Sequence, residues 1–366
     1  MNITIHPSPG RRPRRRPGAR RALTLLVAGS LAVAACGSDD DTPAADSTPS
    51  DTATDSPAGD AFPVTIETTF GETTIESEPQ RVVSIGFAEH DTILALGVTP
   101  IAVRDWYGDQ PYATWPWAQD ELGDAQPEIL PSTELNFEQI AALNPDVIIG
   151  INSGISEEDY ATLSAIAPTI TRPPGAPDYG TPWRDQLLLT AKALGRTAQA
   201  EQVITDTEAR FAAVREEYPE FAGLEAAVAF TFEELPGAYA SNDTRAQTLA
   251  EFGFVTPAEF DELAGDQFYF TVSDEELDVL DRDVIVWVLS DESGYQALAA
   301  MALRPSLTAY AEGREVIADP LLSGAFSHGS PLSLEYVIDE LVPELALAVD
   351  GDPATEVPSM APLAAD

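Results

Sequence analysis

The sequence of 366 residues contains one cysteine, Cys36, and only three histidines. Without a second cysteine no disulfide can form within the chain, so the folded body must be stabilised by its own hydrophobic core. Basic side chains are also scarce: 19 Lys and Arg stand against 61 Asp and Glu, for a formal net charge of −42. A surface of this sign repels nucleic acid, anionic lipid headgroups and anionic ligands, although it also simply favours solubility. The composition therefore argues against nucleic-acid binding and favours neutral or cationic ligands.

Local signatures of catalysis are missing as well. The sequence has no Gly-x-Ser-x-Gly elbow, no glycine-rich phosphate loop and no His-Glu-x-x-His. Beyond residue 36 only His90 and His328 remain, too few for the histidine-rich ligand set of a bare zinc or manganese site. We therefore expect no catalytic residues, no metal ligands and no cofactor. A carboxylate-pair hydrolase has no local signature and remains a remote alternative.

The N-terminal segment has the pattern of an export signal. Seven arginines lie within residues 11–21, and the apolar run at 22–35 has the length of a signal-peptide core and is too short to span a bilayer. Small residues directly before Cys36 resemble a bacterial lipobox, in which the cysteine thiol is acylated and becomes the mature N-terminus. We expect a lipoprotein signal peptide at 1–35, exported by the Sec or the twin-arginine route. An ordinary cleaved signal with an incidental cysteine is the alternative.

Residues 36–60 consist mainly of Ser, Thr, Asp, Ala, Pro and Gly. Such a segment cannot bury a core, so we expect a disordered tether between the lipid anchor and the folded body. The predicted location is the extracytoplasmic face of the cell membrane. Loss of the signal removes seven arginines and no acidic residue, which makes the mature chain still more acidic.

The remainder of the chain predicts two α/β lobes. Short apolar runs at 82–85, 98–103, 147–149, 226–232 and 284–289 read as strands, and amphipathic stretches follow several of them. Repeated strand–helix–strand units favour mostly parallel sheets. The expected boundaries are an N-terminal lobe at 61–180, a C-terminal lobe at 219–350 and a flexible tail at 351–366. Residues 181–218, interrupted only by Gly195, predict one long connecting helix or two in tandem.

Five segments carry a family resemblance through their order and spacing. They are Glu-Pro-Gln-Arg-Val-Val at 78–83, Leu-Ala-Leu-Gly-Val-Thr-Pro at 94–100, the run at 137–149, Ala-Leu-Gly-Arg at 193–196 and Ser-Pro-Leu-Ser-Leu at 330–334. Over residues 62–349 the chain resembles the substrate-binding lipoproteins of ABC importers for cobalamin and iron-siderophores. The segment at 105–117 is most similar to that of actinobacterial iron-siderophore binding lipoproteins. The resemblance implies two Rossmann-like lobes joined by a single long helix, with the ligand cleft between them.

The same resemblance implies a monomeric protein that captures a solute and delivers it to an ABC permease and, through it, to an ATPase. Family members dock on the permease through one surface carboxylate per lobe. Glu138 matches the first-lobe pattern and Glu275 the second, with Glu276 as an alternative. Each stands in the first turn of an expected helix, where a carboxylate is favoured by the helix dipole. A single stiff connecting helix further implies that lobe closure is only a few degrees.

The aromatic segment after the second predicted strand is a candidate ligand wall. Five aromatic residues fall within residues 106–117, and ligands of parallel sheets bind beyond the carboxyl ends of the strands. Trp115 and Trp117 could equally be core beneath this loop. In the second lobe Phe268 and Glu233 are further candidates beside the predicted contacts. We expect ligand contacts from the following residues: Phe87, His90, Arg104, Trp106, Tyr107, Tyr112, Phe232, Tyr239, Arg245, Tyr269, Tyr295 and His328.

Charge narrows the class of ligand. A tricatecholate iron complex carries about three negative charges and requires clustered arginines, whereas only Arg104 and Arg245 fall in segments expected at the cleft. A neutral or cationic ferric hydroxamate siderophore fits better. Haem ligated by His90 and His328 remains an alternative, as does cobalamin, and lone loop histidines more often serve as hydrogen-bonding residues.

Overall fold

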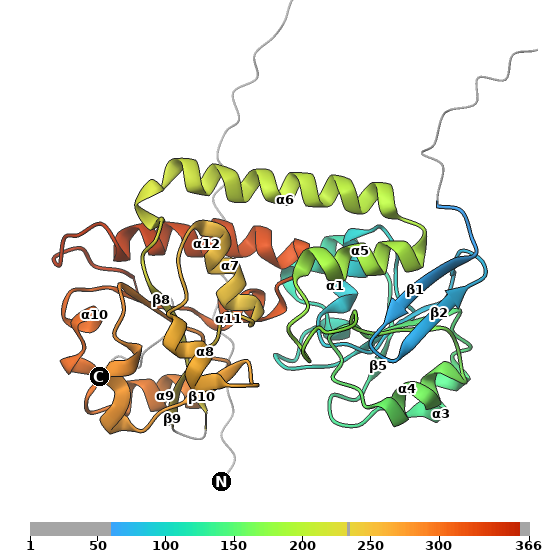
Figure 1. Ribbon diagram of the computed structural model, residues 1–366, viewed down its shortest axis with the longest axis horizontal. Coiled ribbons are helices and arrows are strands. Elements are labelled where there is room, and N and C mark those ends of the chain that lie inside the picture. The colour runs from blue at the N-terminus through green and yellow to red at the C-terminus, as the bar shows by residue number, and fades with distance from the viewer. Residues whose placement is uncertain (1–59, 233–234, 359–366) are drawn as a thin grey trace, which may run out of the picture. The chain divides into compact units, whose positions relative to one another are not determined.

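The computed structural model describes residues 60–232 and 235–358 (Figure 1). The expected signal peptide, Cys36, the tether as far as residue 59, Glu233 and residues 359–366 lie outside this range. No helix within the described ranges is both long and apolar enough to cross a membrane. The described residues form two α/β lobes, each built on a five-stranded sheet, as the sequence predicts.

The N-terminal lobe contains a parallel sheet with the strand order β5-β4-β3-β6-β7 and a separate antiparallel hairpin, β1-β2. Its elements are β1 (Val64–Thr68), β2 (Gly71–Ile75), β3 (Val82–Ser84), α1 (Glu89–Ala95), β4 (Ala102–Arg104), η1 (Pro111–Ala113), η2 (Pro116–Ala118), α2 (Gln119–Leu122), β5 (Glu128–Leu130), α3 (Phe137–Ala142), β6 (Val147–Ile149), α4 (Glu157–Ser164) and β7 (Thr169–Ile170). The expected strand at 98–103 is shorter and begins at Ala102. The chain reverses its direction of travel across the sheet between β3 and β6, a switch point where ligands of open parallel sheets bind.

The C-terminal lobe has the order β10-β9-β8-β11-β12, in which β8, β11 and β12 are parallel while β9 and β10 pair in antiparallel fashion. Its elements are β8 (Ala226–Phe232), β9 (Leu235–Tyr239), α7 (Thr244–Phe252), α8 (Ala258–Ala264), β10 (Tyr269–Thr271), η4 (Asp274–Leu280), β11 (Val284–Trp287), α9 (Glu292–Ala300), η5 (Arg304–Ser306), α10 (Thr308–Ala311), β12 (Glu315–Ile317), α11 (Pro320–His328) and α12 (Pro331–Ala348). Its switch point lies between β8 and β11. The strand expected at 226–232 is found with those bounds.

The connection between the lobes consists of two helices in tandem rather than one continuous helix. Helix α5 (Trp183–Leu194) ends at Gly195, whose φ of 69° is left-handed, and α6 (Thr197–Glu217) continues for 21 residues, about 31 Å at 1.5 Å per residue. A short 3-10 turn, η3 (Pro219–Phe221), then leads into β8. A glycine in this conformation is a typical helix C-cap, which explains the break.

A second connection is formed by the C-terminal helix. Helix α12 contacts α1 of the N-terminal lobe and also α6, which in turn lies against α5 (Figure 1). One hydrophobic core runs through all of these helices and includes Ile93, Leu187, Phe211 and Leu341. Separate cores lie on the opposite face of each sheet. The lobes therefore share a continuous core instead of being joined by flexible strands.

Candidate functional site

A chain of aromatic rings, here called the aromatic arc, extends from the N-terminal lobe to the C-terminal lobe. Neighbouring ring centroids along it are 4.7 to 6.3 Å apart, which is the usual spacing of interacting aromatic pairs. In order, its members are Trp117, Trp115, Tyr107, Trp106, Phe87, Tyr179, Phe268, Tyr269, Phe230 and Tyr239. Tyr179 completes the arc, because its ring lies between Phe87 and Phe268. The sequence prediction missed Tyr179, which stands in a Pro- and Gly-rich connection without periodicity.

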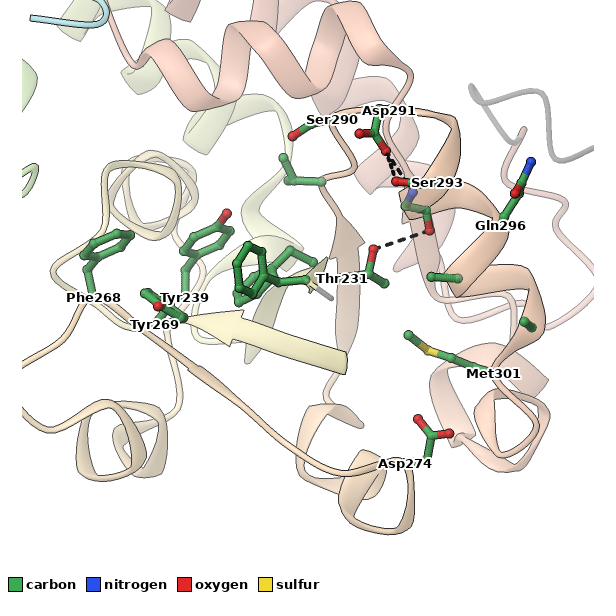
Figure 2. A pocket seen from close by; sticks show the side chains of 16 residues that line it. Thr231, Tyr239, Phe268, Tyr269, Asp274, Ser290, Asp291, Ser293, Gln296 and Met301 are labelled. Atoms are coloured by element: carbon green, nitrogen blue, oxygen red, sulfur yellow. Dashed lines mark hydrogen bonds between the residues drawn. The ribbon is translucent and has the colours of Figure 1, made fainter. Parts of the chain in front are cut away.

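A cavity of about 950 Å³ lies at the C-terminal end of the arc (Figure 2). Its lining comes from the ends of β8 and β11, the length of α9, the ends of β9 and β10 and the start of η4, so it occupies the switch point of the second sheet. Figure 2 shows aromatic side chains such as Tyr239 and Phe268 at one end and polar ones such as Ser290 and Asp291 at the other. None of the 16 described residues that line it is Lys, Arg or His. This cavity can hold a large, partly apolar ligand without anionic groups.

Three of the six expected contacts in the C-terminal lobe line the cavity. Phe232, Tyr239 and Tyr269 line it, together with Phe268. Burial raises the pKa of Tyr239 to about 12, so that its hydroxyl stays protonated and can donate a hydrogen bond. Tyr295 is different, because it is only 3% exposed and its hydroxyl donates to the carbonyls of Leu289 and Ala318. The structure places this side chain in the core beneath the cavity, so its expected ligand contact stays a prediction without support from its position.

The aromatic segment after β4 separates into two groups. Trp106 and Tyr107 are half-buried members of the arc, and the buried hydroxyl of Tyr107 has no hydrogen-bond partner among the described residues. Tyr112 instead packs against the small core around Leu94 and Leu122, and its expected ligand contact has no support in this position. Trp115 is buried and Trp117 partly buried at the other end of the arc, in keeping with the alternative that they are core.

Arg104 is held by backbone carbonyls instead of facing open space. Its guanidinium donates to the carbonyls of Ile85, Ser132, Thr133 and Ser153 at 3.0 to 3.3 Å. It also lies 4.3 Å from the ring centroid of Phe87, a cation–π contact. Burial lowers the pKa of Arg104. These contacts hold three loops and the ring of Phe87 in place. They use the Nη hydrogen-bond donors of Arg104 inside the protein, so its presence is explained without an anionic ligand.

Arg245 is also paired inside the protein. Its Nη1 lies 2.8 and 3.0 Å from the two carboxylate oxygens of Asp243, and its Nε donates to Ser327 at 3.2 Å. The guanidinium stacks 4.1 Å from the ring centroid of Tyr239. Burial lowers the pKa of Arg245, but the Asp243 carboxylate more than reverses this effect, and the net pKa is raised. Asp243 was not predicted, although its position at the N-cap of α7 is a recognisable signal.

The two histidines meet at the junction of the lobes. His90 in α1 and His328 at the end of α11 are 1% and 4% exposed, and their ring centroids are 6.2 Å apart in an edge-on arrangement. Four rings of the arc, those of Trp106, Tyr107, Trp115 and Trp117, lie within 6.5 Å of His328. Burial lowers the pKa of His90 and lowers that of His328 to about 4. Neither histidine lines the cavity, so the expected direct contacts are not supported.

Asp91 links the two lobes beside these histidines. It is fully buried, and its Oδ2 accepts hydrogen bonds from Trp117 Nε1 at 2.7 Å and from Ser330 Oγ at 2.8 Å. Ser330 is the N-cap of α12, so one carboxylate oxygen joins the arc to the helix that spans both lobes. Nothing in the sequence distinguished Asp91 from the many other acidic residues.

Glu89 is another buried carboxylate at the edge of the first sheet. One of its oxygens accepts a hydrogen bond from the backbone N–H of Asn152, and a Cβ at Gly86 would overlap the carboxylate. Burial raises the pKa of Glu89. A larger residue at position 86 would therefore displace this carboxylate from its present position. Within the described ranges, no group of three or more His, Cys, Asp or Glu side chains could hold a metal ion.

The two expected docking carboxylates are exposed. Glu138 lies in the first turn of α3, and Glu275 lies in the first turn of η4. Glu276 closes a capping box with Ser273, its Oε2 lying 2.8 Å from Ser273 Oγ. The carboxylate of Glu276 is therefore engaged within the lobe, which favours Glu275 as the residue available to a partner.

Comparison with known proteins agrees with this architecture. A probable siderophore-binding lipoprotein of Bacillus subtilis, YfiY, is 31% identical over 218 residues, which cover 58% of this chain and 64% of YfiY. The match thus spans somewhat less than two thirds of this curated relative.

Two crystal structures are similar over nearly their whole length. A periplasmic solute binding protein from Mycobacterium smegmatis has a TM-score of 0.70 at 34% identity, covering 78% of this chain and 98% of that one. Streptococcus pneumoniae PiaA in complex with ferrichrome has a TM-score of 0.68 at 29% identity, covering 79% and 99%. The periplasmic binding protein family pattern matches residues 82–320, well over half of the chain, and the protein therefore belongs to the periplasmic binding protein family.

Proposed function

We propose that this protein captures a ferric siderophore outside the cytoplasm and delivers it to an ABC import permease without chemical change. The observation that carries this proposal is the aromatic arc ending at a cavity of about 950 Å³ with no basic residue in its described lining. The similarity to a probable siderophore-binding lipoprotein and to a ferrichrome complex supports the same class of ligand.

A hydroxamate complex suits the charges of the site best. Ferric trihydroxamates carry no net negative charge, whereas a tricatecholate complex carries about three. Arg104 is engaged with carbonyls and Arg245 with Asp243, so neither guanidinium is available as an unpaired cation for such an anion. The aromatic side chains Phe232, Tyr239, Phe268 and Tyr269 would surround the organic part of the ligand.

Delivery would depend on an anchor and a docking surface. Acylation of Cys36 would hold the body on the outer face of the membrane, and residues 37–59 would give it reach. Glu138 and Glu275, one on each lobe and both exposed, would pair with arginines of the permease. Because α6 and α12 both connect the lobes through one core, closure on binding should be only a few degrees.

Haem is less well supported as the ligand. His328 is enclosed by four aromatic rings and by His90, and neither imidazole reaches the cavity. Ligation of haem iron would require the whole lobe junction to open. Cobalamin needs no histidine from the protein, and the titration described below tests whether it binds.

A titration of tryptophan fluorescence tests the proposal. The full-length protein in detergent is titrated with ferrichrome, ferrioxamine, a ferric tricatecholate, haem and cobalamin. Saturable quenching by a hydroxamate complex is expected, because Trp106 belongs to the aromatic arc that ends at the cavity. A response to haem or cobalamin alone would contradict the siderophore proposal while leaving the binding-protein family intact.

A further inference from the structure

The pair formed by Asp243 and Arg245 stands directly behind the wall of the cavity. Asp243 is 3% and Arg245 is 9% exposed. The Arg245 guanidinium stacks on Tyr239, and Tyr239 lines the cavity, so one aromatic ring separates this cation from the ligand space. Arg245 Nη1 contacts both oxygens of Asp243, at 2.8 and 3.0 Å. Any change in the charge of this pair would therefore change the electrostatic potential inside the cavity.

An anion-binding site needs an uncompensated cation, whereas the charge of Arg245 is compensated by Asp243. A buried guanidinium facing an anionic ligand through a single ring would attract it strongly, because buried charges are poorly screened by salt. Asp243 cancels that attraction. Arg104, the other buried arginine near the arc, donates to four carbonyls and cannot replace it. The described lining of the cavity itself contributes no cation but includes the carboxylates of Asp274 and Asp291.

We propose that Asp243 is a specificity-determining residue, which neutralises Arg245 and thereby restricts the cavity to ferric siderophores without net negative charge. The inference rests on the proposed function and deepens it by assigning ligand selection to one ion pair. Asp243 touches no ligand in this scheme. It acts through Arg245 and Tyr239, and its removal would convert a neutral wall into a cationic one.

The direct test is the variant Asp243→Asn. Asparagine is as good an N-cap as aspartate, so the hydrogen bond from the Arg245 backbone N–H to the cap side chain, 2.9 Å in this structure, can be kept while the charge is lost. Dissociation constants are measured on the full-length protein for ferrichrome, which is neutral, and for a ferric tricatecholate. The ratio of the two constants should shift toward the anionic complex by about tenfold or more, an order of magnitude expected for one uncompensated charge near a polyanion.

Two further variants make the result interpretable. Asp243→Asn combined with Arg245→Gln removes both charges and should restore the wild-type preference, even if each variant loses some stability. Glu315→Gln is the matched control, because Glu315 pairs with Arg304 at 3.0 Å and both are largely buried, but neither lines this cavity. It should leave the ratio unchanged. Because Arg245 is buried, the gain for the anionic complex in Asp243→Asn should change little with salt.

Other outcomes separate the two proposals. If the wild-type protein binds ferrichrome but Asp243→Asn shows the same ratio of constants, the role of Asp243 is refuted and the proposed function stands. If the wild-type protein already binds the tricatecholate as tightly as ferrichrome, the role of Asp243 is likewise refuted and capture of a ferric siderophore still stands. If no variant binds any ferric siderophore, the proposed function itself fails, and the inference falls with it.

Discussion

The two lobes contribute to the candidate site in different ways. In the N-terminal lobe the rings of Phe87, Trp106 and Tyr107 pack on one another, and Arg104, which donates to four carbonyls, stacks on Phe87. In the C-terminal lobe the corresponding edge of the sheet is hollow, and rings such as Tyr239 border open volume. One lobe thus provides a filled, rigid platform and the other provides the space.

The difference originates in the sheets. All strands of the first sheet are parallel, and the helix that follows β3, α1, carries buried polar groups such as Glu89 and Asp91. In the second sheet β8 and β9 form an antiparallel hairpin, while the chain crosses to β11 on the other side. The gap between the ends of β8 and β11 becomes the cavity. Ligand selectivity should accordingly depend on the C-terminal lobe, and rigidity on the junction.

The largest expected effect is on transport. Charge reversal by Glu138→Arg should abolish uptake of the ferric siderophore in cells while leaving affinity unchanged, because Glu138 is exposed on α3 and is not among the cavity residues. Glu275→Arg should act in the same way from the other lobe. Uptake of radiolabelled iron complex and fluorescence titration give the two readouts.

The matched control is Glu157→Arg, which reverses an exposed carboxylate in the first turn of α4 in the same lobe. It should transport normally. Loss of affinity together with uptake in Glu138→Arg would mean that this face binds ligand, which would reverse the division of roles between the lobes.

The junction should show the next largest effect. Asp91→Ala leaves Trp117 Nε1 and Ser330 Oγ without their shared acceptor, and two buried unsatisfied donors cost about 3 kcal/mol in the free energy of unfolding. Unfolding by denaturant measures this loss in the free energy of unfolding. Asp339→Ala breaks an exposed ion pair with Arg210 and should cost less than about 1 kcal/mol. Equal effects of the two variants would show that the junction does not stabilise the protein as described.

Aromatic truncation compares the two ends of the arc directly. Tyr239→Ala removes a ring that lines the cavity and should weaken hydroxamate binding about 30-fold, or about 2 kcal/mol. Phe87→Ala should cost less, about fivefold, because Phe87 is outside the described lining of the cavity. Tyr310→Ala, an exposed ring that stacks on Arg304 away from the cavity, is the control and should have no effect. A larger loss at Phe87 than at Tyr239 would place the ligand on the N-terminal lobe.

A smaller effect should appear in the pH dependence of stability. Burial depresses the pKa of His328 to about 4, against about 6.5 in an unfolded chain. The unfolded state then binds more protons than the folded one between these values, so stability is complete above pH 6.5 and decreases as the pH falls. From pH 7 to 5.5 the loss should be about 1 kcal/mol.

The groups that face His328 set this pKa. His90 and Arg245 oppose its protonation, whereas Asp91 and the carbonyl of Gly324 favour it, and burial outweighs them all. His328→Gln should flatten the curve between pH 7 and 5.5, apart from the contribution of His90, whose pKa is lowered as well. An unchanged slope in the variant would contradict the assignment.

The regular parts of the fold could be predicted from the sequence because their signals are local. Continuous apolar runs identified β8 and β11, and their alternation with helices indicated parallel sheets. The aromatic segment after β4 was expected beyond a strand end, where its rings are found in the aromatic arc, while its contact with ligand stays a prediction. The break at Gly195 agrees with the alternative of two helices in tandem, which the sequence left open beside one continuous helix.

The parts that could not be predicted depend on contacts distant in sequence. The role of Arg104 follows from carbonyls in three different loops, and that of Asp91 from a serine 239 residues away. Tyr295 looked like a cavity residue because it follows a strand, but its side chain points into the core. Asp243 and Arg245 are only two residues apart in sequence, yet their relation to the cavity is shown only by the ring of Tyr239, on which Arg245 stacks.

A crystal structure of the full-length protein with bound ferrichrome tests the central claim most directly. The account predicts the ferric complex inside the cavity, against Tyr239 and Phe268, with Arg245 still paired to Asp243 and the lobes displaced by only a few degrees. Ferrichrome bound elsewhere, or bound by an Arg245 that has left Asp243, would contradict it.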